Sequence, residues 1–136
     1  MADCIFCKIA NKEIPAEVVY EDAHTTAVLD INPIAPGHTM ILPKKHAENI
    51  LDLDDAEVEP LFTAVKRVTA LLNGTLHPDG FTIGMNHGKW AGQAIDHIHV
   101  HVIPRWKTDG GHSIHGVVVN PPTQSLTEIR KQIIKE

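Results

Sequence analysis

Apolar positions recur along the chain with two different periods, and these periods predict its elements. A two-residue period rich in Val, Ile and Thr predicts strands, because successive side chains of a strand point to opposite faces. A helical period of apolar residues predicts one long helix at Val58, Leu61, Phe62, Val65, Val68, Leu71 and Leu72. The predicted strands are 18–20, 25–31, 38–42, 80–86 and 97–104, and the predicted helices are 54–73 and 125–134.

The connections between the predicted strands are short, which favours antiparallel neighbours. The segment 32–37 holds two prolines, which exclude it from the centre of a sheet. We therefore predict an α+β fold: a mainly antiparallel sheet with one long packed helix and a short C-terminal helix.

The chain has 136 residues, the size of one domain with one hydrophobic core, so we expect a single domain over 1–136. The net charge of −5, with histidines neutral, argues against a nucleic-acid partner, since phosphate backbones require clustered Lys and Arg. No apolar run is long enough to cross a membrane, and the first residues carry an acid and no apolar leader. We expect a cytoplasmic protein with no membrane partner.

The segment from Asp96 to Arg105 holds three histidines that alternate with aliphatic residues. On a strand this spacing places His97, His99 and His101 on one face, roughly 6–7 Å apart, and turns the aliphatic residues away. Imidazole is nucleophilic and titrates near neutral pH, so one histidine can attack phosphorus while a neighbour protonates a leaving group. Alternatively the histidines fill a half-exposed face, or they chelate a metal. Chelation by the outer two is restricted by their separation of roughly 13 Å.

The two cysteines, Cys4 and Cys7, have the C-x-x-C spacing. A redox dithiol of the thioredoxin type needs a strand before the first cysteine, and three residues leave no room for one. The pair can also be two structural cysteines, or half of a zinc site that takes two histidines from elsewhere. The spacing alone leaves these interpretations open.

The segment 97–103, His-Ile-His-Val-His-Val-Ile, resembles the signature of the histidine triad (HIT) family of nucleotide hydrolases and transferases. The similarity extends to the blocks 4–9, 12–15, 30–33 and 37–46, to Asn86, to Gly92-Gln93 and to Pro104-Arg105. Beyond Arg105 it thins, so the tail from about 106 is divergent. The resemblance implies a HIT-like fold. It also implies that the middle histidine attacks the α-phosphorus of a nucleoside phosphate derivative, after which water releases the nucleoside monophosphate.

The resemblance implies roles for individual residues. His99 corresponds to the nucleophile, and His101 to the histidine that contacts the phosphate and helps the leaving group. Gln93 corresponds to a residue near the scissile bond, and His38 is expected to line the active site. Many members have Ser or Thr after that Gln, whereas this chain has Ala94, which leaves only a backbone N–H.

A purine nucleotide is the substrate that the resemblance implies. Asp30 corresponds to the acid that binds the ribose hydroxyls, although an acid before Asn-Pro can also be a turn former. Asn86, Gly92 and Ala94 correspond to contacts at the sugar–phosphate end. The apolar base pocket corresponds to Phe6, Ile9, Ile14, Leu29 and Ile31, which composition alone would assign to the core.

In the zinc-bearing branch of the family, two histidines complete the cysteine site, and the resemblance assigns them to His46 and His97. A structural Zn²⁺ held by Cys4, Cys7, His46 and His97 would attach the catalytic strand to the N-terminal segment. His38 is the substitute if His46 points away. The family also implies a two-fold homodimer with a continuous sheet, which would cover the apolar helix and a strand edge.

Two classes of function compete. The first is a hydrolase that acts on a dinucleoside polyphosphate or a nucleoside phosphoramidate, and the second is a non-catalytic nucleotide- or zinc-binding module. Three triad histidines together with Gln93 favour the enzyme, because a binder needs no nucleophile. A sugar-phosphate transferase is a weaker third hypothesis, because members of that branch have Gln at the position where this chain has His101.

Trp90 is either a stacking surface or a packing residue. The remaining histidines are predicted at the surface: His24, His77, His87, His112 and His115.

Overall fold

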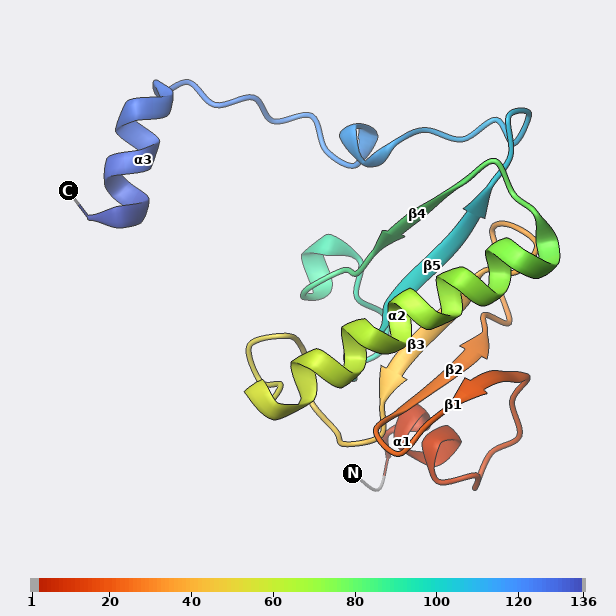
Figure 1. Cartoon of the computed structure of the whole chain (residues 1–136). Coiled ribbons are helices and arrows are strands. Elements are labelled where there is room, and N and C mark those ends of the chain that lie inside the picture. The colour runs from red at the N-terminus through yellow and green to blue at the C-terminus, as the bar shows by residue number, and fades with distance from the viewer. Residues whose placement is uncertain (1–2, 136) are drawn as a thin grey trace.

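A computed structural model describes residues 3–135 and shows a five-stranded antiparallel sheet with one long helix across a face (Figure 1). The strand order is β1-β2-β3-β5-β4. The strands are β1 (Val18–Glu21), β2 (Thr25–Leu29), β3 (Thr39–Pro43), β4 (Gly80–Gly84) and β5 (Val100–Arg105). The helices are α1 (Ile5–Ala10), α2 (Asp55–Leu76) and α3 (Leu126–Ile134), with short 3₁₀ turns η1 (Lys89–Ala91) and η2 (Ile114–Gly116). The predicted α+β fold with a mainly antiparallel sheet is confirmed.

The hydrophobic core lies on both faces of the sheet. Between the sheet and α2, Ile41, Leu61 and Val68 belong to one buried cluster. On the opposite face, Phe6 of α1 packs with Leu42 and other residues of β2 and β3 in a second cluster. The central strands are therefore buried on both sides, which fixes their position relative to both helices.

The strand β5 begins later than the sequence predicts. Its ladder with β3 ends at the pair Ile41↔Val100, so His97 and His99 lie in a short lead-in segment before the strand, which bends at His97. The Ile98 N–H donates to the carbonyl of Ala47, outside the ladder, at 2.8 Å. The alternation nevertheless continues through this lead-in, because Ile98 and Val100 are buried under α2. The predicted separation of histidines from aliphatic residues is confirmed.

The helix α2 does not end at Asn73-Gly74, as predicted, but at Leu76, where His77 adopts a left-handed conformation. Leu72 and Leu76 pack beside Gly37, at the point that a Cβ of this residue would occupy. We infer that this packing outweighs the cost of about 1 kcal/mol for a glycine inside a helix. The other strand boundaries shift by one or two residues.

The helix α1 was not predicted, because six residues are too few to show a helical period. It begins after Cys4, whose sulfur accepts a hydrogen bond from the Cys7 N–H at 3.3 Å. The first cysteine therefore caps the helix and the second lies within it. This geometry turns both sulfur atoms to the same end of α1.

The segment after β5 leaves the body of the domain as an extended arm that ends in α3 (Figure 1). Every residue from 107 to 128 is exposed. Exposed apolar residues of this arm include Val117, Val118, Val119 and Leu126. The arm therefore adds little to the core of the chain that carries it.

Gly37 offers a test of this packing, because its φ of +84° favours glycine and a Cβ there would meet Leu76 and Pro104. Replacing Gly37 by Ala is expected to lower the free energy of unfolding by roughly 1–3 kcal/mol in urea titrations. The control is Gly74→Ala, where a Cβ meets nothing within 4 Å. That change should raise stability by about 0.5–1 kcal/mol. Equal effects of the two substitutions would contradict this account.

Candidate active site and metal centre

His99 is held in one tautomer by the backbone. Its Nδ1 lies 2.8 Å from the carbonyl oxygen of His97, and since a carbonyl only accepts, Nδ1 carries the proton. The other ring nitrogen, Nε2, therefore keeps its lone pair. The ring packs edge-on against Phe6 at a centroid distance of 4.9 Å and against His101 at 5.0 Å. These contacts limit its rotation and orient Nε2 as the candidate nucleophile.

A second chain of hydrogen bonds fixes the tautomer of His101. The Ile34 N–H donates to Nδ1 of the buried His38 at 3.3 Å, so the proton of His38 lies on Nε2. This Nε2–H donates to Nδ1 of His101 at 2.9 Å, and an Asp30 carboxylate oxygen lies 3.6 Å from the same nitrogen of His38. His101 must then carry its proton on Nε2. The ring that carries this donor lies 5.0 Å from the His99 ring, centroid to centroid.

Burial keeps the His101 ring neutral. Together with smaller effects of the neighbouring His99 and His38, burial lowers the pKa of His101 to about 4. Burial also lowers the pKa of His38, against the attraction of the Asp30 carboxylate. At neutral pH His101 therefore offers an N–H donor without a full positive charge.

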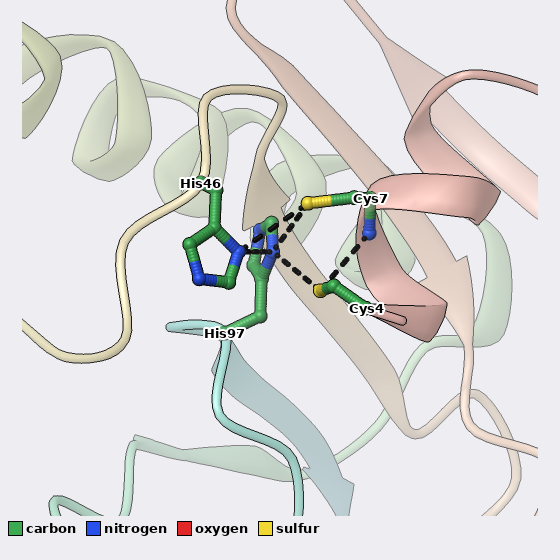
Figure 2. A group of neighbouring side chains, drawn as sticks. All are labelled: Cys4, Cys7, His46 and His97. Atoms are coloured by element: carbon green, nitrogen blue, oxygen red, sulfur yellow. Dashed lines mark hydrogen bonds between the residues drawn. The ribbon is translucent and has the colours of Figure 1, made fainter. Parts of the chain in front are cut away.

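Four side chains from three segments meet beside this site (Figure 2). Nδ1 of His97 lies 3.3 Å from the Cys4 sulfur, 3.5 Å from the Cys7 sulfur and 3.2 Å from Nδ1 of His46. The Cys7 sulfur lies 3.3 Å from Nδ1 of His46. The other nitrogen of His97, Nε2, donates to the carbonyl of Pro43 at 2.8 Å, so Nδ1 faces the cluster as a lone pair.

The spacing of these four atoms fits a tetrahedral zinc ion. With zinc bonds of about 2.3 Å to sulfur and 2.0–2.1 Å to nitrogen, ligand atoms in a tetrahedron are about 3.3–3.8 Å apart. The recorded separations of 3.2–3.5 Å are close to this range. Burial raises the pKa of the Cys7 thiol and lowers that of His97 to about 4. The neutral imidazole suits a metal, and a bound cation would favour the thiolate.

The Gly-Gln turn is closed by its own hydrogen bonds. The N–H groups of Gly92 and Gln93 donate to the carbonyls of Lys89 and Gly88. They are therefore not available to a phosphate, contrary to the expectation. The Gln93 amide accepts from the Gly88 N–H at 2.8 Å and donates to the carbonyls of Glu48 and Ile95. This side chain links three backbone segments.

Two polar groups near this turn remain open. Among residues 3–135, neither the Ala94 N–H nor the Asn86 side chain has a hydrogen-bond partner. The Asn86 amide lies 3.5 Å from the point that a Cβ of Gly92 would occupy. The left-handed φ of +101° at Gly92 makes this close approach possible.

The predicted nucleoside pocket is only partly assembled in the chain. Phe6 is buried beside His99, and Ile9, Ile14, Leu29 and Asp30 are half-buried, whereas Ile31 is 89% exposed on the turn after β2. One Asp30 oxygen accepts from the Asn32 N–H at 2.9 Å, which is the turn-forming contact expected before Asn-Pro.

The remaining aromatic and imidazole residues lie at the surface. The predicted exposure of His24, His77, His87, His112 and His115 is confirmed. Trp90 is 99% exposed, so packing within the described chain does not explain it. The sequence pattern did not indicate the backbone carbonyls of Pro43 and His97 that orient two of the rings, because every residue has a carbonyl.

The profile of the HIT domain matches residues 11–108 of the chain. The chain belongs to the HIT family. It is 46% identical to an uncharacterised HIT-like protein of Methanocaldococcus jannaschii, across 96% of this chain and 98% of that protein. It is 39% identical to an adenosine 5'-monophosphoramidase of Candida albicans, across 76% and 71% of the two chains. HIT family members therefore include nucleotide hydrolases.

Solved structures of the HIT family agree with this fold. A Bacillus subtilis member has a TM-score of 0.86 at 36% identity, with 98% of this chain and 96% of that chain covered. A Zn-bound histidine triad family protein from Mycobacterium smegmatis has a TM-score of 0.75 at 32% identity, with 90% and 85% covered. Within residues 3–135 of this HIT protein, no helix is long and apolar enough to span a membrane.

The hydrogen-bonded pair of His38 and His101 predicts an unusual titration of this HIT domain. The His101 ring should stay neutral down to about pH 4, against an ordinary value of 6.5. Because its folded pKa is lowered, the neutral ring contributes stability above pH 6.5, and this is lost as the pH falls to about 4. Ring resonances in NMR, assigned through His101→Gln, measure this midpoint. A midpoint near 6.5 would contradict the tautomer and burial described here.

Proposed function

We propose that this chain is a nucleotide hydrolase that cleaves a nucleoside phosphate derivative at the α-phosphorus through a nucleotidyl–His99 intermediate. One observation carries the proposal: the 2.8 Å hydrogen bond from Nδ1–H of His99 to the His97 carbonyl, which leaves Nε2 as an oriented lone pair. A pure binding module has no need of this orientation. The monophosphoramidase among the relatives supports the same reaction class.

In the first step, the lone pair of His99 Nε2 attacks the α-phosphorus and forms a nitrogen–phosphorus bond. The bond from phosphorus to the leaving atom breaks, and its electron pair stays on the leaving atom, which accepts a hydrogen bond from Nε2–H of His101 and takes its proton from water, leaving hydroxide. Nε2–H of His38 donates to Nδ1 of His101 and keeps the His101 proton on Nε2. The cationic nucleotidylated ring of His99, at a centroid distance of 5.0 Å from His101, offsets negative charge that builds on the leaving atom.

In the second step, water attacks phosphorus from the side that the leaving group vacated. The water gives its proton to the hydroxide formed in the first step, and the electron pair of the nitrogen–phosphorus bond returns to His99. Nucleoside monophosphate then leaves, and both rings are in their starting tautomers. The hydrogen bond of His99 to the His97 carbonyl is kept throughout, so the nucleophile stays in position.

We assign substrate contacts to groups around these rings. Asp30 would accept from the ribose hydroxyls through the oxygen that does not bond Asn32. The Ala94 N–H and the Asn86 amide would bind the phosphate oxygens, with Gly92 permitting their approach. The side chain of Gln93 would act as a positioning residue for this turn. The base of a purine nucleotide would lie against Phe6, Ile9, Ile14, Leu29 and Ile31.

We propose that Cys4, Cys7, His46 and His97 hold a structural Zn²⁺. Their separations and the Zn-bound relative support this assignment. When bound, the ion supplies no reaction chemistry, because all four protein ligands close its coordination. It would fix the His97 ring and hence the carbonyl that orients His99.

We also propose that the chain forms the expected two-fold homodimer. Phe62 and Leu71 on α2 are 40% and 41% exposed, and β4 is an edge strand whose Ile83 is 40% exposed. A second copy that extends the sheet across β4 would cover these apolar groups.

Replacing His99 by Ala tests the proposed nucleophile. Turnover of an adenosine phosphoramidate should fall on the order of 10⁴-fold or more, while nucleotide binding measured by calorimetry survives. The control is His87→Ala. His87 is an exposed histidine outside the candidate active site, so this variant should keep wild-type turnover. Quenched wild-type reactions should give a nucleotidyl adduct on His99 in peptide mass spectra. Near wild-type turnover of His99→Ala, or an adduct on His97, would refute the assignment.

His101→Ala separates departure of the leaving group from nucleophilic attack. With a good leaving group such as a nitrophenol, departure needs little help from the His101 N–H and the loss should be small. With an alkylamine the loss should be much larger. Equal losses with both leaving groups would remove His101 from leaving-group departure.

Metal analysis tests the proposed centre. Protein purified without chelator should contain about one zinc per chain, and His46→Ala should lower this content, whereas His77→Ala should not. Removal of the metal should lower the unfolding temperature without unfolding the domain, because a core exists on both sides of the sheet. Zinc-free protein in which both cysteines react with an alkylating agent would exclude this site.

A further inference from the structure

We infer that Gln93 is a positioning residue that couples metal binding to phosphate binding. An occupied metal centre holds the Gly-Gln turn, residues 88–94, in the conformation that binds a nucleotide phosphate, and the nucleotide in turn raises the affinity for the metal. This coupling rests on the proposed hydrolase function and zinc centre, and it regulates that same site. It passes through the metal loop, which we define as residues 44–53 between β3 and α2 and which carries His46 (Figure 2).

The metal loop is bonded to the active site through two consecutive carbonyl groups that follow the ligand His46. The buried Ala47 accepts from the Ile98 N–H at 2.8 Å, in the lead-in that holds the triad histidines. The next carbonyl, of Glu48, accepts from Nε2 of Gln93 at 2.6 Å. A displacement of His46 on loss of the metal would therefore be felt both in the lead-in and in the Gly-Gln turn.

The amide of Gln93 uses all its hydrogen atoms on backbone groups. Nε2 donates to the carbonyls of Glu48 and Ile95, at 2.6 and 3.0 Å, and Oε1 accepts from the Gly88 N–H at 2.8 Å. Because an amide has two N–H donors on nitrogen and an acceptor on oxygen, these three bonds fix its orientation. Gly88 begins the turn and Ile95 follows it. One side chain thus joins both ends of the turn to the metal loop.

A cavity of about 450 Å³ is lined by residues of both segments, which include His46 and Glu48 of the metal loop and Ala94 of the turn. This space leaves room for the metal loop to shift when His46 is released. The Ala94 N–H, our proposed phosphate donor, follows Gln93 directly in the chain. A shift of Gln93 would therefore move this donor.

The coupling must act in both directions. An ion on His46 restricts the metal loop, and a phosphate on the Ala94 N–H restricts the turn. Because Gln93 joins the two segments, the second ligand finds part of the ordering already done and binds more tightly. Thermodynamic linkage then requires that the nucleotide and the metal raise each other's affinity by the same factor.

A second connection from the metal centre runs through His97, whose carbonyl orients His99. This connection does not involve Gln93. A variant of Gln93 therefore separates the two, because it breaks the link to the turn and leaves the metal ligands and the nucleophile in place.

The experiment measures zinc affinity by competition with a chromophoric chelator, with and without saturating AMP. We expect AMP to raise the zinc affinity about tenfold, and zinc to raise the AMP affinity equally in calorimetry. Adenosine, which lacks the phosphate, should leave the zinc affinity nearly unchanged. Gln93→Leu keeps the size of the side chain without its hydrogen bonds and should abolish the coupling. The matched control is Gln132→Leu, at an exposed position of α3, which should keep the wild-type factor.

Amide hydrogen exchange in the wild-type protein provides a measurement that needs no variant, so it decides even if Gln93→Leu does not fold. The Gly88 N–H donates to Gln93 and should exchange on the order of tenfold faster after removal of the metal. The N–H groups of β2, inside the sheet, should keep their rates.

Zinc affinity that does not respond to AMP would overturn the inference, as would an equal response to adenosine, full coupling in Gln93→Leu, or unchanged exchange at Gly88. In these cases turnover and the His99 adduct would remain, and the proposed hydrolase function with them. Protein that binds no AMP and forms no adduct would overturn the hydrolase function and this inference together. Protein that binds no zinc would overturn the metal centre and the inference, but not the nucleophile.

Discussion

The carbonyl group of His97 determines the chemistry of the candidate site, because it fixes which nitrogen of His99 carries the proton. The position of a carbonyl depends on its backbone, and the backbone of His97 is well fixed because the residue is 0% exposed. Its own ring is bonded to the Pro43 carbonyl at the end of β3 and faces the Cys4 and Cys7 sulfur atoms. The position of the nucleophile thus depends on the N-terminal helix and the central strand together.

Much of this arrangement follows from the sequence. The alternation of histidine and aliphatic residues determines the two faces, because a strand has a period of two and the aliphatic side chains must be buried. Ile98, Val100 and Val102 lie on the core side as predicted, with the imidazoles opposite, and the structure adds that α2 covers them. The four residues of the metal cluster were assigned through family resemblance, and the structure brings the same four together.

Other features depend on contacts that no local pattern contains. The length of α2 depends on leucines packed beside Gly37, and the ladder of β5 with β3 stops at Ile41↔Val100 although β3 continues to Pro43. The Gly-Gln turn was expected to present its N–H groups to phosphate, but the turn uses two of them to close itself. Backbone hydrogen bonds of this kind arise only when distant segments meet.

The exposed arm has a consequence for how proteins with this domain can diverge. Residues 107–128 are exposed, so substitutions there carry little cost in folding, whereas the histidines are tied to the core. One wall of a cavity beside His101 belongs to this unconstrained part of the chain. The shape of this cavity can therefore change over generations while the histidines stay fixed, because the two lie in segments with separate structural constraints.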